Sequence, residues 1–173
     1  MKKISLISLL FLGICCCSSP RELATVIKVD INKYAGRWYE IARLPNSFEK
    51  GLECITAVYK VRDDGDIDVI NKGHQADNRE IVEEANGKAW VPDPNFPGRL
   101  KVSFFWPFAG DYYIIELDDN YQYVLVGDPS RDYLWILSKA KILDDNVYNK
   151  LIKTAKQRGF DTEKMIIVKH DCK

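Results

Sequence analysis

Few residues of this chain have the types and spacing needed for covalent or metal chemistry. There are two histidines, His74 and His170, and five cysteines. Three cysteines stand together near the start and two lie far beyond them: Cys15, Cys16, Cys17, Cys54 and Cys172. The motifs Cys-x-x-Cys, His-Glu-x-x-His and Gly-x-Ser-x-Gly and a glycine-rich phosphate loop are all missing from the sequence. We therefore predict no metal site, no cofactor and no catalytic triad.

Carboxylates and a free thiol offer the remaining routes to catalysis. Glu40 and Glu116 fall in strand-like segments and could point inward, but the sequence places no second carboxylate beside either of them. A general acid and base pair is therefore not predicted. The enzymatic alternative is Cys54 acting as a nucleophile inside the folded domain. We predict a binding protein rather than an enzyme.

The start of the chain has the composition of a secretion signal. Lys2 and Lys3 precede an apolar run over residues 4–14, which is too short to stay in a bilayer as a spanning helix. The cysteines and the polar residues after them resemble a bacterial lipoprotein cleavage site, at which a cysteine becomes the acylated N-terminus. We predict a signal peptide over 1–16, acylation of Cys17, and a tether over 17–30. The alternatives are acylation of Cys15 or Cys16, or an ordinary signal with incidental cysteines.

Cys54 and Cys172 remain in the exported chain. An even pair of cysteines in an exported protein favours a disulfide. This bond would close a loop of more than a hundred residues, for which chain entropy predicts a stabilisation of about 4–5 kcal/mol.

Length and charge limit the class of protein. The chain of 173 residues has a formal net charge of zero, which does not favour a nucleic-acid partner. Residues 31–173 are enough for a single domain with a sizeable core.

The middle of the chain alternates apolar and polar residues between turn signals, as an antiparallel sheet does. Eight strands are predicted, over residues 37–44, 54–62, 67–75, 80–91, 99–105, 111–117, 122–127 and 133–139. Asn86 and Gly87 indicate either a bulge in a long bent strand, which we favour, or a hairpin that splits it. An all-β fold follows: an eight-stranded antiparallel up-and-down β-barrel, which has no free sheet edge and encloses one small ligand.

A helical period replaces the strand period after residue 143. Its predicted apolar face comprises Val147, Tyr148, Leu151, Ile152 and Ala155. Asp144 or Asp145 can cap the start, and Gly159 follows the last turn. We predict one helix packed on the barrel wall, then a short edge strand over residues 165–170 that leads to Cys172.

Two distant segments together suggest how the barrel is closed. In residues 34–43, Gly36 permits a tight turn and the Trp38 indole is large enough to plug the narrow end of a small barrel. In residues 128–139, the late cation Lys139 could lie on the indole face. With these segments, and with residues 64–73, 101–105 and 119–121, the chain resembles the lipocalin family, most closely its bacterial outer-membrane lipoproteins and the animal member apolipoprotein D.

The resemblance implies a location and a role. It implies the outer membrane, with the Cys17 acyl chains as anchor, and it agrees with a bond between Cys54 and Cys172. It also implies binding of fatty acids or lysophospholipids for lipid storage or transport and membrane maintenance. A carrier of a pigment or a tetrapyrrole is the alternative ligand class.

The barrel interior is the predicted site. If Cys54 faces outward, then Ile55, Ala57, Tyr59 and Val61 point inward. Tyr59, Asn71 and Trp135 match positions that line the pocket in similar lipocalins, and we add Phe48, Phe104 and Tyr113 as lining candidates. Sparse polar groups in an apolar lumen suit an amphipathic lipid.

Four loops are expected at the barrel mouth, over residues 45–53, 76–79, 106–110 and 128–132. They carry the aromatic residues Phe48, Trp106 and Phe108. Exposed aromatic residues usually mark a contact surface. The sequence leaves open whether the loop at Trp106 meets ligand, bilayer or a second subunit in a homodimer.

Overall fold

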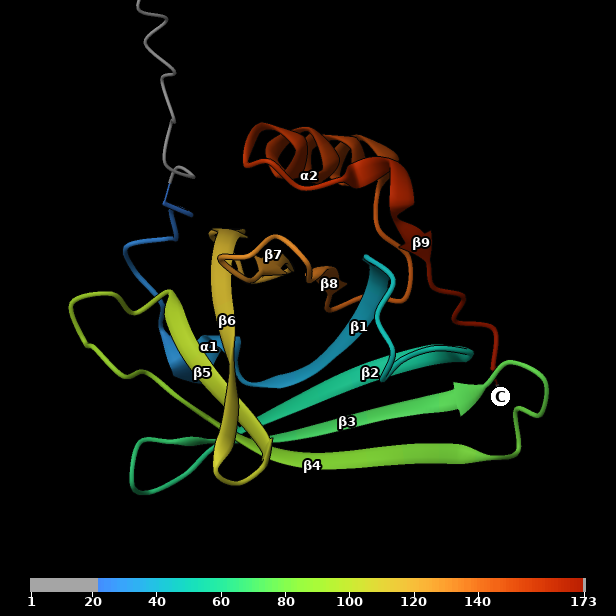
Figure 1. The fold of residues 1–173 in the computed structure, drawn as a ribbon, viewed down its shortest axis with the longest axis horizontal. Helices are drawn as coiled ribbons and strands as arrows, with labels where there is room; N and C mark the ends of the chain where they lie inside the picture. Colours follow the sequence, from blue (N-terminus) through green and yellow to red (C-terminus); the bar gives the residue numbers. More distant parts are fainter. Residues whose placement is uncertain (1–21, 173) are drawn as a thin grey trace, which may run out of the picture.

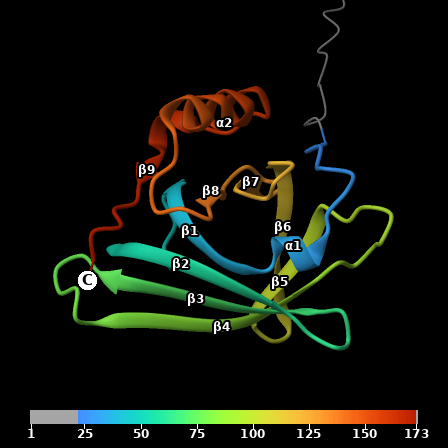
Figure 2. The same cartoon turned by 180° about the vertical axis from the view of Figure 1, so that it is seen from behind.

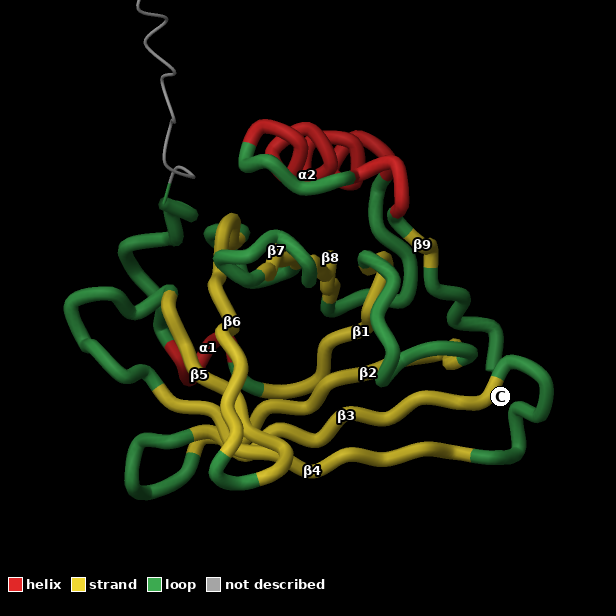
Figure 3. The backbone as a smooth tube through the Cα atoms, viewed as in Figure 1, coloured by secondary structure: helices red, strands yellow, loops and turns green. Residues whose placement is uncertain are grey.

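Strands dominate the part of the chain that the structure describes, a computed structural model of residues 22–172 (Figure 3). Two α-helices and one turn of 3-10 helix accompany nine strands among these residues. In chain order the elements are α1 (Ile31–Tyr34), β1 (Gly36–Arg43), β2 (Leu52–Val61), β3 (Ile67–Gln75), β4 (Val82–Trp90), β5 (Arg99–Phe105), β6 (Phe108–Leu117), β7 (Tyr123–Gly127), β8 (Leu134–Ser138), α2 (Asp145–Gln157), η1 (Thr162–Lys164) and β9 (Ile166–Ile167).

The first eight strands close into a barrel. Each pairs antiparallel with the next, and β1 pairs with both β2 and β8, so the sheet has no first or last strand (Figure 1). The short strand β9 pairs antiparallel with the end of β1. The predicted eight-stranded up-and-down barrel with one C-terminal helix is confirmed.

Alternation along the strands divides the core into two parts. On β8, Trp135 and Leu137 belong to the group of side chains inside the barrel. Leu134 and Ile136 belong to a second group, which includes Leu151 of α2. Figures 1 and 2 show α2 above β7 and β8, outside the barrel. The wall therefore has one apolar face toward the lumen and another under the helix.

Helix α2 forms where the helical period predicts it. The Asp144 side chain accepts hydrogen bonds from the backbone N–H groups of Asn146 and Val147, which caps the first turn. Leu151 and Ala155 are fully buried against the wall. The helix ends before Gly159, whose φ of +92° is a conformation that favours glycine.

The prediction of a bulge at Asn86 and Gly87 is wrong, and the alternative of a hairpin that splits the strand is excluded as well. Asn86 pairs with Ile70 and Gly87 with Val69 in an unbroken register between β3 and β4. Gly87 has a different reason to be glycine, because a Cβ there would lie 2.7 Å from the ring of Phe104. The missing side chain lets that ring lie against the strand.

One side of the sheet is only partly paired near the barrel mouth. Strand β4 pairs with β5 only over Lys88–Trp90, so residues 82–87 pair with β3 alone among the described strands. The turn from β5 to β6 is shorter than the predicted loop over 106–110, because Phe105 already pairs with Phe108. The aromatic side chains at this tip stand in solvent: Phe105, Trp106 and Phe108 are 81%, 84% and 78% exposed.

The described part of the predicted tether is packed on the barrel. Leu23 is 1% exposed within the outer part of the core. The Val26 N–H donates to the Ile114 carbonyl at 2.9 Å. The structured domain thus begins before the predicted boundary at residue 31. The predicted signal peptide over 1–16 and the cysteines Cys15, Cys16 and Cys17 lie outside the described residues. Among residues 22–172, no helix is long and apolar enough to span a membrane.

Candidate functional site

The narrow end of the barrel is closed by the residues that the sequence predicts. Trp38 is fully buried, and its Nε1–H donates to the Tyr34 carbonyl at 2.7 Å. The Lys139 Nζ lies 4.1 Å from the centroid of the indole and donates to the Ala35 carbonyl at 2.7 Å. Gly36, with φ of +94°, makes the turn that brings these groups together. This end of the barrel is therefore closed by packed side chains.

Small residues surround Asn71 on the lumen wall. Asn71 pairs in register with Ala57 of β2 and Ala85 of β4. Ala57 belongs to the inner core, so Asn71 faces the lumen as predicted. Its Oδ1 is buried and has no hydrogen-bond partner among residues 22–172. A buried amide oxygen without a partner is costly, and a ligand with a donor group would satisfy it.

Four of the other five predicted lining residues also lie in the lumen or at its mouth. Tyr59 is 7% exposed inside the barrel, and Phe104 and Trp135 pack against the same inner group. Phe48 lies at the mouth, where its ring centroid is 6.3 Å from that of Trp135. Contact of these residues with a ligand stays a prediction.

Tyr113 does not belong to this set. It packs with the outer core and lies with its ring 5.6 Å from the guanidinium of Arg99. The adjacent Tyr112 points inward instead and packs with the inner core. The sequence missed Tyr112 because two neighbouring tyrosines satisfy the alternation equally well on either face.

Three tyrosine hydroxyls form a short hydrogen-bonded chain in the lumen. The hydroxyl of Tyr112 lies 2.6 Å from that of Tyr34 and 2.9 Å from that of Tyr59. Burial raises the pKa of all three phenols, so they stay protonated. The three O–H groups supply three hydrogens, but the three hydroxyls form only two hydrogen bonds with one another. One hydrogen therefore has no acceptor among these three hydroxyls. The lumen thus offers a hydroxyl donor as well as the Asn71 acceptor.

Arg43 forms a buried charged cluster with two glutamates, and the sequence did not predict this cluster. Arg43 Nη1 donates to Glu40 Oε1 at 2.9 Å, and its Nε lies 3.7 Å from Glu49 Oε2. Glu40, Arg43 and Glu49 are 3%, 4% and 8% exposed. Burial, then the nearby Glu49 carboxylate, raises the pKa of Glu40, although Arg43 opposes this.

Glu49 corrects the expectation that no second carboxylate accompanies a strand carboxylate. It lies in the loop between β1 and β2, where no periodic pattern signals its direction. Glu116, the other predicted candidate, pairs with Lys150 of α2 at 3.2 Å and has no part in the lumen.

The loop between β1 and β2, which carries Glu49, lies across the barrel mouth and is held there by hydrogen bonds and a ring contact. Trp135 Nε1–H donates to Glu49 Oε2 at 3.1 Å, and Arg43 Nη2 donates to the Glu49 carbonyl at 2.8 Å. Phe48 stacks on Tyr133, with ring centroids 5.8 Å apart. The two sites of contact hold the loop above the lumen.

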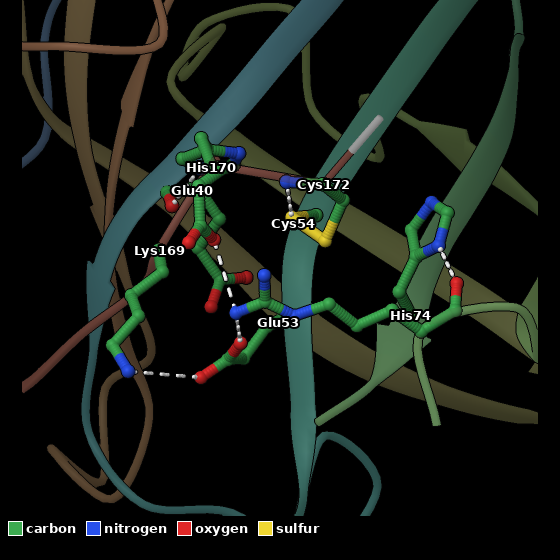
Figure 4. Close-up of a disulfide and its surroundings, with 9 residues drawn as sticks. Glu40, Glu53, Cys54, His74, Lys169, His170 and Cys172 are labelled. Atoms are coloured by element: carbon green, nitrogen blue, oxygen red, sulfur yellow. Dashed lines mark hydrogen bonds and ion pairs between the residues drawn. A yellow bond between two sulfur atoms is a disulfide. The ribbon is translucent and has the colours of Figure 1, made fainter. Parts of the chain in front are cut away.

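The C-terminal tail is fixed to the barrel close to this loop. Figure 4 shows the disulfide between Cys54 and Cys172, with an S–S distance of 2.05 Å. Beside it, His170 Nε2–H donates to the Glu40 carbonyl at 2.8 Å, and Lys169 pairs with Glu53 at 3.6 Å. The predicted disulfide is present, and because its sulfur is bonded, Cys54 has no thiol to act as a nucleophile.

Metal ligands do not gather elsewhere in the described chain. The one group of potential ligands found among residues 22–172 consists of Cys54, Asp171 and Cys172. Both of its sulfurs belong to the disulfide. The arrangement of the lumen suits binding of a small molecule by apolar contact and a few hydrogen bonds.

Comparison with known proteins agrees with this architecture. A family model described as a lipocalin-like domain matches residues 29–170. Outer membrane lipoprotein Blc of Vibrio cholerae is 44% identical, over 88% of this chain and 90% of its own. The protein of the same name from Escherichia coli K12 is 45% identical, over 91% of this chain and 90% of its own.

More distant proteins also match this chain. Bovine apolipoprotein D is 34% identical over 80% of this chain and 75% of its own. Among solved structures, insecticyanin from the tobacco hornworm superimposes with a TM-score of 0.69 at 25% identity, covering 87% of this chain and 85% of its own. With its eight-stranded barrel, its closure by Trp38 and Lys139, and these matches along most of its length, the chain belongs to the lipocalin family.

Proposed function

We propose that this protein is a lipid-anchored lipocalin of the outer membrane that holds a fatty acid or a lysophospholipid in its barrel, for lipid storage or transport and membrane maintenance. The composition of the lumen is the observation that carries this proposal. Aliphatic and aromatic side chains form most of its wall, with the Asn71 amide and the tyrosine hydroxyls as the sparse polar groups. Each buried methylene of an acyl chain contributes about 0.8 kcal/mol, and the polar groups orient the head.

Membrane attachment is proposed to occur through Cys17. Two relatives more than 40% identical to this chain are named outer membrane lipoproteins, and more than one acyl chain on a cysteine is enough for stable anchoring. Cys17→Ser should abolish acylation and release the protein from the outer-membrane fraction. Cys16→Ser is the matched control and should remain attached. Attachment of both variants would contradict the assignment.

Binding rather than catalysis is proposed as the activity of the lumen. Cys54, which would be the nucleophile of a lipocalin-type enzyme, is tied to Cys172. Glu40 is paired with Arg43 and Glu49 is occupied by Trp135, so neither carboxyl is positioned as a free base. Alkylation of the native, unreduced protein should therefore modify neither Cys54 nor Cys172.

The ligand class is tested by native mass spectrometry of protein from its own host, followed by lipid extraction. A fatty acid or lysophospholipid titration should then show binding that Tyr59→Ala weakens by about 1–3 kcal/mol through lost apolar contact and a lost hydrogen bond. Lys101→Gln, on an outward residue paired with Asp111, is the control and should bind like the wild type. If Tyr59→Ala and Trp135→Ala both bind the lipid as tightly as the wild type does, the lumen is not the lipid site. Visible absorption of the fresh protein would indicate a pigment instead.

A further inference from the structure

Three aromatic rings form an open cluster at the barrel mouth. The rings of Tyr133 and Trp135 are stacked with centroids 5.9 Å apart and an interplanar angle of 7°. Phe48 lies against both of them, at 5.8 Å and 6.3 Å. Phe48 is 58% exposed and Tyr133 39% exposed, so the cluster can be reached from outside. We call Phe48, Tyr133 and Trp135 the mouth aromatics.

Two buried carboxyl groups stand directly behind the mouth aromatics. Glu49 Oε2 accepts the hydrogen bond from Trp135 Nε1 at 3.1 Å, which ties one carboxyl to the cluster. Glu40 is the second, and Arg43 reaches both of them. No further cation of residues 22–172 forms an ion pair with either carboxyl. Arg43 therefore supplies one positive charge for two buried carboxyls, and Glu40 meets this shortage with a raised pKa, which favours its protonated form.

We propose that the mouth aromatics, with Glu49 and Glu40 behind them, form a subsite for the cationic nitrogen head of an amphipathic ligand whose acyl chain lies in the lumen. This inference rests on the function proposed above and specifies its ligand. The negative faces of aromatic rings attract ammonium groups, and quaternary ammonium is bound in this way by aromatic cages. A cation there is also attracted by the Glu49 carboxylate, whose Oε2 lies 3.1 Å from Trp135 Nε1. A free fatty acid, whose head is an anion, gains neither contribution.

The test compares two lipids that both contain a phosphodiester and differ in whether the group beyond it is cationic. Lysophosphatidylcholine and lysophosphatidylglycerol with the same acyl chain are titrated, below their micelle concentrations, into the mature chain carrying Cys17→Ser, so that no detergent is needed. Calorimetry is the readout, since it does not depend on Trp135 fluorescence. We expect the choline lipid to bind about tenfold more tightly or better, which is the scale of a desolvated cation and aromatic contact.

The variants locate the preference. Glu49→Gln removes one charge with little change in shape, and Tyr133→Leu removes one exposed ring. Each should reduce the preference for the choline lipid to about threefold or less, while lysophosphatidylglycerol binds as well as before or better. Glu84→Gln is the matched control, because Glu84 is an outward carboxylate paired with Lys72 at 2.7 Å, and it should keep the full preference.

Each outcome decides the inference. Equal binding of the two lipids by the wild type, tighter binding of lysophosphatidylglycerol, or a preference that survives both variants would overturn the subsite and leave the proposed lipid binding intact. Failure of the wild type to bind either lipid would overturn both. Circular dichroism checks the fold of each variant, and if Glu49→Gln is unfolded, the exposed Tyr133→Leu decides alone.

Discussion

The disulfide between Cys54 and Cys172 should contribute several kcal/mol to stability, and one substitution can remove it. The two cysteines are 118 residues apart, and for a loop of that length the chain-entropy relation predicts a stabilisation of about 5 kcal/mol at room temperature. Relief of native strain and residual structure in the unfolded chain reduce this value. We therefore expect Cys172→Ser to lower the free energy of unfolding by about 3–5 kcal/mol.

The variant should nevertheless fold, because other contacts keep the tail in place. Strand β9 pairs with Ala42 and Arg43, the Cys54 N–H donates to the Lys169 carbonyl at 2.8 Å, and Arg79 pairs with Asp171 at 3.0 Å. Lipid binding should persist, since neither cysteine lines the lumen.

Urea unfolding followed by circular dichroism measures the effect. The control is addition of a reductant. It should lower the free energy of unfolding of the wild type to that of Cys172→Ser, and it should leave the free energy of unfolding of the variant unchanged. A loss below about 1 kcal/mol, or a reductant effect on the variant equal to that on the wild type, would refute the loop-entropy reasoning.

Three further outcomes are expected from the lumen and its closed end. Lys139→Met should cost about 1–2 kcal/mol in urea unfolding, because it removes the cation over Trp38 and the hydrogen bond to the Ala35 carbonyl; an unchanged midpoint would contradict the closure. Tyr112→Phe breaks both bonds of the hydroxyl chain and should cost about 1–3 kcal/mol, whereas Tyr113→Phe, on the outer face, should be near neutral; equal effects would contradict the assignment of faces. Because burial raises the pKa of Glu40 above its unfolded value, the folded state binds its proton more tightly. This contribution to stability is present at low pH and is lost as the pH rises through the folded pKa, so Glu40→Gln should make stability less dependent on pH above about 4.3; parallel pH profiles for wild type and variant would contradict the shift.

The sequence determined the features that depend on local repetition or on a small number of special residues. Period-two segments located the eight barrel strands, with β3 and β5 predicted to the residue. The helical period and the Asp144 cap located α2. Trp38 and Lys139 indicated the closure, and the two remaining cysteines indicated the disulfide. Each of these signals comes from side chains whose size, charge or spacing has one favourable arrangement.

The tertiary structure alone decided which side chains meet inside the barrel. Alternation says that Tyr112 and Tyr113 face opposite ways, but the closure of the sheet and the irregular registers of β6 with its neighbours choose Tyr112 for the lumen. Gly87 gave the signal of a bulge and instead makes room for a ring from the next strand. Glu49 lies in a loop, where no period fixes a direction, and its place beside Glu40 and Arg43 results from the fold of that loop over the mouth. Periodicity encodes which residues share a face, whereas contacts across a closed barrel depend on register and loop path, which a linear pattern does not contain.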